Sequence, residues 1–208
     1  MRARQKQDAH PAQRRASKME HDIIVIGVSA GGIAALKILV AGLPHNLKAS
    51  LFIVLHIPAS QPSTLPQILS CAGPLPALHP TEGTVIEQGK IYVAPPDYHL
   101  IIEEGYLHLG TGPKEQYVRP AANVLFRSAA QWYGPRVVGV VLTGFGQDGT
   151  DGLLAIKHHG GVAVIQDPHD ALVPFMPQSA LAHNHIDYII PLSNMAPLLV
   201  CLVSSSPS

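Results

Sequence analysis

The sequence predicts an α/β fold built on a doubly wound, mostly parallel sheet, and two observations carry this prediction. Continuous apolar and β-branched runs at 23–26 and 137–142 are typical of strands that are buried on both faces of a parallel sheet. Segments with a helical period alternate with such runs, which is the pattern of parallel β–α–β units. The chain of 208 residues is 47% hydrophobic and 13% charged, so it has ample material for one core.

The first predicted unit is a strand at 23–26, a tight glycine-rich turn at 27–32 and a helix at 33–43. Apolar residues recur in the helical segment with the period of one buried face. A second strand follows at 51–55 and ends at His56. The chain therefore opens in the way that a parallel sheet requires.

The middle of the chain predicts antiparallel hairpins. Two pairs of short apolar runs flank turn sequences that contain glycine, one pair within residues 85–93 and the other within residues 100–109. We expect these hairpins to form a small antiparallel excursion at one end of the sheet.

Alternation then resumes to the end of the chain. We expect helices at 120–133, 153–159, near 177–182 and at 195–203, and strands at 137–142, 162–165 and 188–190. This order indicates a Rossmann-like, doubly wound sheet.

Basic residues gather in the opening segment, which we expect to be a disordered tail. Residues 1–20 have no apolar period, and their basic side chains are spaced too loosely to favour a nucleic-acid arm. We expect one folded domain at 21–203 and a flexible C-terminus at 204–208.

Composition argues against several classes of function. The formal net charge is zero with histidine neutral, so the chain has no overall attraction to nucleic acid. No apolar run reaches about 18 residues, and we expect no membrane insertion. Cys71 and Cys201 have no CxxC spacing, and the N-terminus lacks the order of a secretory signal. A cytoplasmic protein without a thiolate metal site is the expectation.

Three polar residues follow predicted strands at the edge where ligands bind in open α/β sheets. Ser29 follows the first strand, His56 ends the second, and Asp148 follows the strand at 137–142. A hydroxyl, an imidazole and a carboxylate are the parts of an activated serine nucleophile. The segment 27–31 also matches G-x-S-x-G, a sharp strand-to-helix turn that exposes the serine at a helix N-terminus. Together these residues predict ester hydrolysis.

Each residue taken alone favours a structural interpretation. Small residues at a strand–helix turn are frequent for packing, and a single histidine is more often a structural hydrogen-bonding group than a base. Asp148 in a glycine-rich turn is typical of a helix cap. The catalytic hypothesis depends on all three residues sharing one edge of one sheet. Their chain order, Ser, His, Asp, also differs from the Ser, Asp or Glu, His order of the common α/β-hydrolases.

At these residues the sequence resembles the CheB family of chemotaxis protein-glutamate methylesterases. The family's nucleophile segment, G-x-S-[TA]-G-G, is matched by G-V-S-A-G-G at 27–32. Its histidine segment is matched by V-L-H-I-P at 54–58, and its L-T-G-M-G-x-D-G segment by L-T-G-F-G-Q-D-G at 142–149. The similarity runs from about Asp22 to the final predicted strand.

The resemblance implies a Ser29 nucleophile, a His56 general base and acid, and an Asp148 carboxylate that orients the imidazole. It implies that Ala30 and Phe145 support the oxyanion and its loop. The implied substrate is a glutamyl methyl ester on the cytoplasmic region of a methylated chemoreceptor, with glutamine deamidation by the same acyl-enzyme route. No cofactor and no metal are implied.

Several positions depart from the family pattern. Phe145 replaces the usual Met, Ala30 stands where Thr is common, Ala122 and Asn123 replace a typical Ser or Val and Asp, and Phe175 replaces a Gly. We expect no receiver domain before the predicted domain, whereas family members usually carry one. We therefore expect regulation to differ, or to come from another polypeptide such as a separate receiver protein.

Two other functions remain open from the sequence. A signalling scaffold on a decayed esterase fold is compatible with the departures near the predicted cleft. A nucleotide- or phosphate-binding module shares the strand, glycine-rich turn and helix, but no acidic residue ends its second strand for ribose recognition. The twelve histidines include no zinc motif such as HExxH, so metal binding is not predicted.

Overall fold

The computed structural model of the protein describes residues 21–57 and 62–204. The predicted tail at 1–20, most of the predicted C-terminal segment at 204–208, and Pro58 of the histidine motif lie outside the described residues. The elements in chain order are β1 (Ile23–Val28), α1 (Gly32–Ala41), β2 (Ser50–Leu55), α2 (Leu65–Ala72), β3 (Ala77–Leu78), β4 (Thr84–Val85), β5 (Ile91–Val93), β6 (His99–Ile102), β7 (Tyr106–Gly110), α3 (Ala122–Tyr133), β8 (Val137–Val141), α4 (Thr150–His158), β9 (Val162–Gln166), α5 (Phe175–His183), β10 (Tyr188–Ile190) and α6 (Met195–Ser204).

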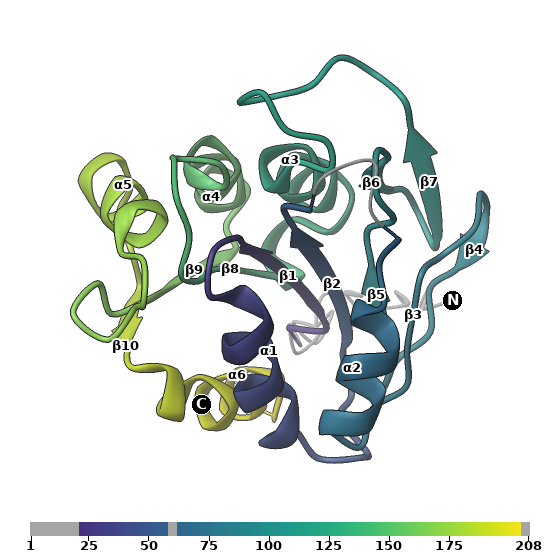
Figure 1. Ribbon diagram of the computed structural model, residues 1–208, viewed down its shortest axis with the longest axis horizontal. Helices are drawn as coiled ribbons and strands as arrows, with labels where there is room; N and C mark the ends of the chain where they lie inside the picture. The colour runs from purple at the N-terminus through teal and green to yellow at the C-terminus, as the bar shows by residue number, and fades with distance from the viewer. Residues whose placement is uncertain (1–20, 58–61, 205–208) are drawn as a thin grey trace, which may run out of the picture.

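The predicted fold class is confirmed. A seven-stranded sheet runs in the order β10-β9-β8-β1-β2-β5-β3, and every adjacent pair in it is parallel. A separate three-stranded sheet, in the order β4-β7-β6, is antiparallel and lies at one side of the molecule (Figure 1). It is the predicted antiparallel excursion.

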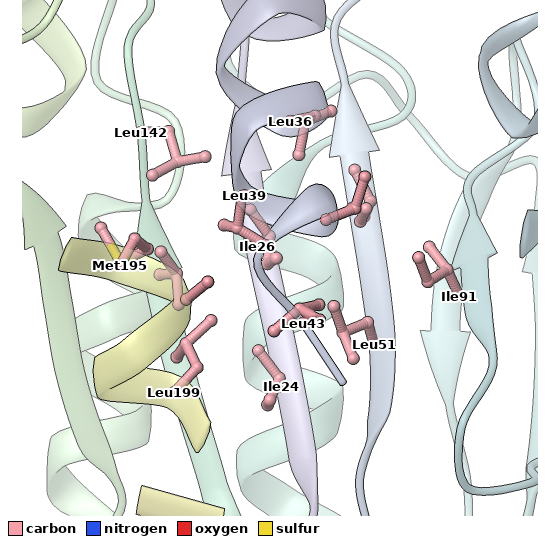
Figure 2. Close-up of a cluster of buried hydrophobic side chains, with 14 of the residues drawn as sticks. Ile24, Ile26, Leu36, Leu39, Leu43, Leu51, Ile91, Leu142, Met195 and Leu199 are labelled. Atoms are coloured by element: carbon pink, nitrogen blue, oxygen red, sulfur yellow. The ribbon is translucent and has the colours of Figure 1, made fainter. Parts of the chain in front are cut away.

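Helices cover both faces of the parallel sheet because its strands bury side chains on both sides. One core lies between the sheet and α1, α2 and α6, and Figure 2 shows Leu39, Ile26 and Met195 packed together in it. The other core lies between the opposite face and α3, α4 and α5. Alternate residues of β1 contribute to the two cores, Ile24 to the first and Val25 to the second.

The predicted hairpin within residues 85–93 is wrong, whereas the one within 100–109 is confirmed as the β6–β7 pair. The turn before β5 exists, with Gly89 in the left-handed region at φ 74°, but it carries the chain from one sheet to the other. β5 pairs in parallel with β2 because all three of its residues are buried, and the central sheet can cover both of their faces.

The described residues contain no helix that is long and apolar enough to cross a bilayer.

Candidate active site

Ser29 lies at the carboxyl end of β1, which is flanked by β2 and β8 in the parallel sheet. Its backbone N–H donates to the carbonyl of Thr143 at 3.0 Å, which fixes it beside the segment that follows β8. Gly31 then turns the chain into α1 with a φ of 79°, a left-handed conformation that glycine adopts without strain. The turn places Ser29 at the N-terminus of α1 and leaves it partly exposed.

His56 follows β2 on the neighbouring strand. Its backbone N–H donates to the carbonyl of Val28 at 3.3 Å and extends the β1–β2 pairing to the end of the sheet. Its Nε2 atom lies 2.8 Å from Oδ2 of Asp148, and the side chains of His56 and Asp148 are only 13% and 2% exposed. Residues 92 positions apart in the chain thus form one partly buried hydrogen-bonded pair.

The carboxylate of Asp148 binds backbone N–H groups at the N-terminus of α3, although Asp148 itself lies just before α4. Its Oδ2 accepts the N–H of Ala122 at 2.5 Å, and its Oδ1 accepts the N–H groups of Asn123 at 2.9 Å and Gly149 at 3.0 Å. The first two donors belong to the first turn of α3, whose N–H groups and dipole favour an anionic partner. The structural interpretation of Asp148 as a helix cap is therefore correct, and the capped helix is α3. The same carboxylate also contacts the imidazole of His56.

The side chain of Asn123 caps the N-terminus of α4 in a similar way. Its Oδ1 accepts the N–H of Gly149 at 2.9 Å and that of Gly152 at 2.8 Å, and the residue is fully buried. Asp148, which precedes α4, thus caps the N-terminus of α3, and Asn123, which lies in α3, caps the N-terminus of α4. In the sequence Asn123 stands out only as a departure from a family pattern. A polar residue on the buried face of a predicted helix was the available signal.

Gly144 brings the segment after β8 against Ser29. A methyl group on Gly144 would lie 2.7 Å from Cβ of Ser29, closer than real side chains approach, and would also overlap the sulfur of Met176. The preceding Thr143 is fixed by a buried amide, because its N–H donates to Oε1 of Gln166 at 3.1 Å. Only glycine permits this contact between the two loops.

Two backbone N–H groups beside Ser29 are available to a ligand. Within the part of the chain that the structure describes, the N–H groups of Ala30 and Phe145 donate to no hydrogen-bond acceptor. Ala30 directly follows Ser29, and Phe145 directly follows Gly144. Both donors belong to the segments that meet at the serine.

Ser29 and His56 line one cavity of about 250 Å³, together with the first turn of α1. No hydrogen bond joins the Ser29 hydroxyl to the imidazole among the described residues. His56 also borders a second cavity of about 310 Å³, whose other wall includes Lys114, Tyr117 and Arg119. The imidazole therefore stands between two open spaces.

One wall of the second cavity is a tight turn, which an ion pair between two side chains stabilises. Gln116 and Tyr117 have φ values of 51° and 64°, and Glu115 and Val118 pair across them. Arg127 binds the carboxylate of Glu115 through both of its terminal nitrogens, one of them at 2.7 Å. These hydrogen bonds lower the pKa of Glu115 and keep it anionic. The Gln116 side chain also accepts a 3.2 Å hydrogen bond from Gln147, one residue before Asp148.

The structure thus brings His56 and Asp148 together, sets Ser29 on the cavity that His56 lines, and sets Ala30 and Phe145 beside Ser29. The catalytic roles assigned to these residues stay predictions. Among the described residues no group of three or more His, Cys, Asp or Glu side chains is arranged to hold a metal ion.

Comparisons with known proteins agree on one family. The CheB methylesterase family model matches residues 24–199. A putative protein-glutamate methylesterase/protein-glutamine glutaminase of Leptospira interrogans is 39% identical over 88% of this chain and 96% of its own length. The protein-glutamate methylesterase/protein-glutamine glutaminase 2 of Methanosarcina mazei is 37% identical over 88% of this chain, which spans only 52% of that protein.

The fold agrees as well. The crystal structure of the Thermotoga maritima CheB methylesterase catalytic domain matches with a TM-score of 0.84 and 32% identity, over 88% of this chain and 98% of that one. The residues that the family model matches, 24–199, include Ser29, His56 and Asp148. The chain belongs to the CheB methylesterase family.

Proposed function

We propose that this chain is a serine esterase that hydrolyses glutamyl methyl esters on the cytoplasmic region of chemoreceptor-like proteins. The observation that carries the proposal is the partly buried 2.8 Å contact between His56 Nε2 and Asp148 Oδ2, beside a cavity that Ser29 and His56 line. Family membership supports the reaction class, and the names of the relatives support glutamyl methyl esters and glutamine side chains as substrates.

The contacts of Asp148 support one assignment of the ring nitrogen of His56 that acts as the base. A carboxylate that accepts three backbone N–H groups acts as an acceptor only, so the hydrogen in its contact with the imidazole lies on Nε2. The neutral imidazole then carries its lone pair on Nδ1. This assignment is the reverse of the usual Ser-His-Asp arrangement, in which the carboxylate binds Nδ1–H and Nε2 is the base.

The reaction proceeds through an acyl-enzyme. Nδ1 of His56 takes the Ser29 proton as Oγ bonds to the ester carbon, and the carbonyl oxygen becomes an oxyanion. The N–H groups of Ala30 and Phe145 stabilise that charge, a contribution of about 10²–10³ in rate for one donor. The tetrahedral intermediate then breaks its bond to the methoxy oxygen, which leaves as methanol with the proton from Nδ1.

Water completes the cycle. Nδ1 takes one proton of a water molecule as its oxygen attacks the acyl carbon, and Ser29 leaves with that proton to restore the hydroxyl. The product is a glutamic acid side chain, which releases the second proton of the water to solvent and becomes a carboxylate. A glutamine side chain follows the same route with ammonia as the leaving group. A separate receiver protein as regulator, and a cytoplasmic location, remain predictions that accompany this substrate.

The direct test is release of labelled methanol from a receptor cytoplasmic fragment that carries isotope-labelled methyl esters. We expect release by the purified protein, and labelling of the folded protein by a fluorophosphonate probe. Absence of both in folded protein would favour a non-catalytic signalling scaffold. Probe labelling without methanol release would indicate a serine hydrolase that acts on a different ester.

Replacing Gly144 with Ala is expected to lower kcat by about 10²-fold, because the new methyl group displaces Ser29 from its position and a displacement of about 1 Å is enough for such a loss. Turnover of a small ester measures the effect. Gly112→Ala is the matched control, since a methyl group there meets nothing within 4 Å. Equal turnover in the two variants would contradict the tight contact between Gly144 and Ser29.

A further inference from the structure

Two exposed aromatic rings stack on each other at the edge of the candidate site. Phe145 and Phe175 have ring centroids 5.5 Å apart and ring planes 20° apart, a stacked geometry. They are 61% and 52% exposed, and they come from different segments, the loop after β8 and the start of α5. Large exposed apolar side chains that gather in one place mark an interaction surface more often than isolated ones do.

The backbone holds these rings in a fixed position relative to Ser29. Gly144 donates its N–H to the carbonyl of Val173 at 2.9 Å and accepts the N–H of Met176 at 3.0 Å. These two hydrogen bonds join the segments that carry Phe145 and Phe175. Gly144 itself packs against Ser29, so the ring pair is connected to the serine through a single residue.

The space beside the rings is uncharged. A cavity of about 620 Å³ is lined by Phe145, Phe175, Gly146, Gln147, Gln178 and Ser179. Its polar groups are amides and a hydroxyl, which serve as neutral hydrogen-bond donors and acceptors. A charged ligand group would gain no ion pair there, whereas an apolar side chain would cover two rings.

Leu172 is a further exposed apolar side chain, and it lies over the turn that carries the serine. It is 77% exposed, and its side chain lies over Gly31, where an added methyl group would meet it at 2.8 Å. Leu172 thus lies on the Ser29 turn, and Phe145 and Phe175 are connected to that turn through Gly144. We call these three side chains the apolar rim.

We propose that the apolar rim is a specificity surface, which binds an apolar side chain of the substrate protein next to the esterified glutamate. This inference rests on the proposed esterase function and names a feature of its substrate. The occupant is a segment of the substrate itself, because the rim is continuous with the loops around Ser29 and its cavity contains no charged side chain. Covering one aliphatic side chain there is worth about tenfold or more in specificity.

A double-mutant cycle between enzyme and substrate tests the proposal. Two helical peptides carry one glutamyl methyl ester, with Leu or Ala one helical turn away from it. We expect the wild-type protein to prefer the Leu peptide by about tenfold in kcat/KM, and Phe175→Ala to abolish most of that preference. Leu181→Ala is the matched control, since Leu181 is on the same helix and 42% exposed but does not line the cavity. This control is expected to retain the full preference for Leu.

The outcomes separate the inference from the function on which it rests. Hydrolysis of neither peptide by the wild-type protein would overturn the esterase proposal, and the inference with it. Equal hydrolysis of both peptides, or a Leu preference unchanged in Phe175→Ala, would overturn the inference alone. The wild-type protein could instead show no Leu preference, together with a particle mass by light scattering that is larger than that of Phe175→Ala. That result would show that a second copy covers the rim.

Discussion

Replacing Ser29 with Ala is expected to reduce hydrolysis of a methyl ester substrate by about 10⁵–10⁶-fold, the loss typical of removing the nucleophile of a serine hydrolase. The change deletes one oxygen atom. The backbone contacts of Ser29, its N–H to Thr143 and its carbonyl to the N–H of Gly32, are retained. Activity should therefore disappear without loss of the fold. Labelled methanol release measures the activity, and a urea unfolding curve measures the free energy of unfolding.

The control for this substitution is Ser193→Ala, which removes a hydroxyl from the turn before α6, remote in the chain from the segments that form the site. It should match the wild-type protein in turnover and in fluorophosphonate labelling, whereas Ser29→Ala should be unlabelled. The assignment of Ser29 as nucleophile is wrong if the Ser29→Ala protein, folded by its unfolding curve, still releases methanol at the wild-type rate.

The sequence predicts the common sheet edge at which Ser29, His56 and Asp148 lie, but not the contact between the His56 and Asp148 side chains. Buried β-branched runs predict β1, β2 and β8 as strands of one parallel sheet, and parallel strands end at the same edge. Their adjacency in the order β8-β1-β2 comes from the structure. Residues that follow such strands lie at one edge, although residues 142–147 separate Asp148 from the end of β8. The prediction therefore needed only element types and their order.

Other features depend on contacts that no local pattern encodes. The turn before β5 has hairpin residues, yet the strand joins β2, which lies some 40 positions earlier in the chain, because its burial on both faces outweighs the local turn signal. The helix α2 was missed in a proline-rich stretch, although Pro66 stands in its first turn, where the absent N–H has no helical partner to lose.

The sequence also does not predict which side chains of distant segments pair with each other. The caps exchanged between α3 and α4 require Asn123 and Asp148 to approach across two packed helices. The stacking of Phe145 on Phe175 joins two departures from the family pattern that looked independent in the chain. Periodicity places each residue on a face of its element, but it says nothing about which side chain on another element it meets.

Replacing Asp148 with Asn is expected to lower kcat by about 10⁴-fold through the tautomer of His56. With its amide nitrogen toward the imidazole, the introduced asparagine would donate to Nε2, so the ring proton would move to Nδ1 and the proposed base would lose its lone pair. With the amide reversed, the nitrogen would face the N–H groups of Asn123 and Gly149. In both orientations, a hydrogen-bond donor faces another donor.

The same substitution should also destabilise the fold, in contrast to Ser29→Ala. An amide has one acceptor oxygen where the carboxylate has two, so at least one buried N–H at the start of α3 loses its partner, at about 1–3 kcal/mol in the free energy of unfolding. The control is Asp151→Asn, an exposed carboxylate in the first turn of α4, which should change neither quantity appreciably.

Nitrogen-15 NMR of the imidazole separates the tautomer effect from a general loss of structure. In the wild-type protein we expect the hydrogen on Nε2 of His56 and a lone pair on Nδ1. A folded Asp148→Asn protein with the hydrogen moved to Nδ1 and low kcat would support the orienting role of the carboxylate. If the folded variant kept both the wild-type tautomer and the wild-type kcat, Asp148 would be a cap for α3 and nothing more.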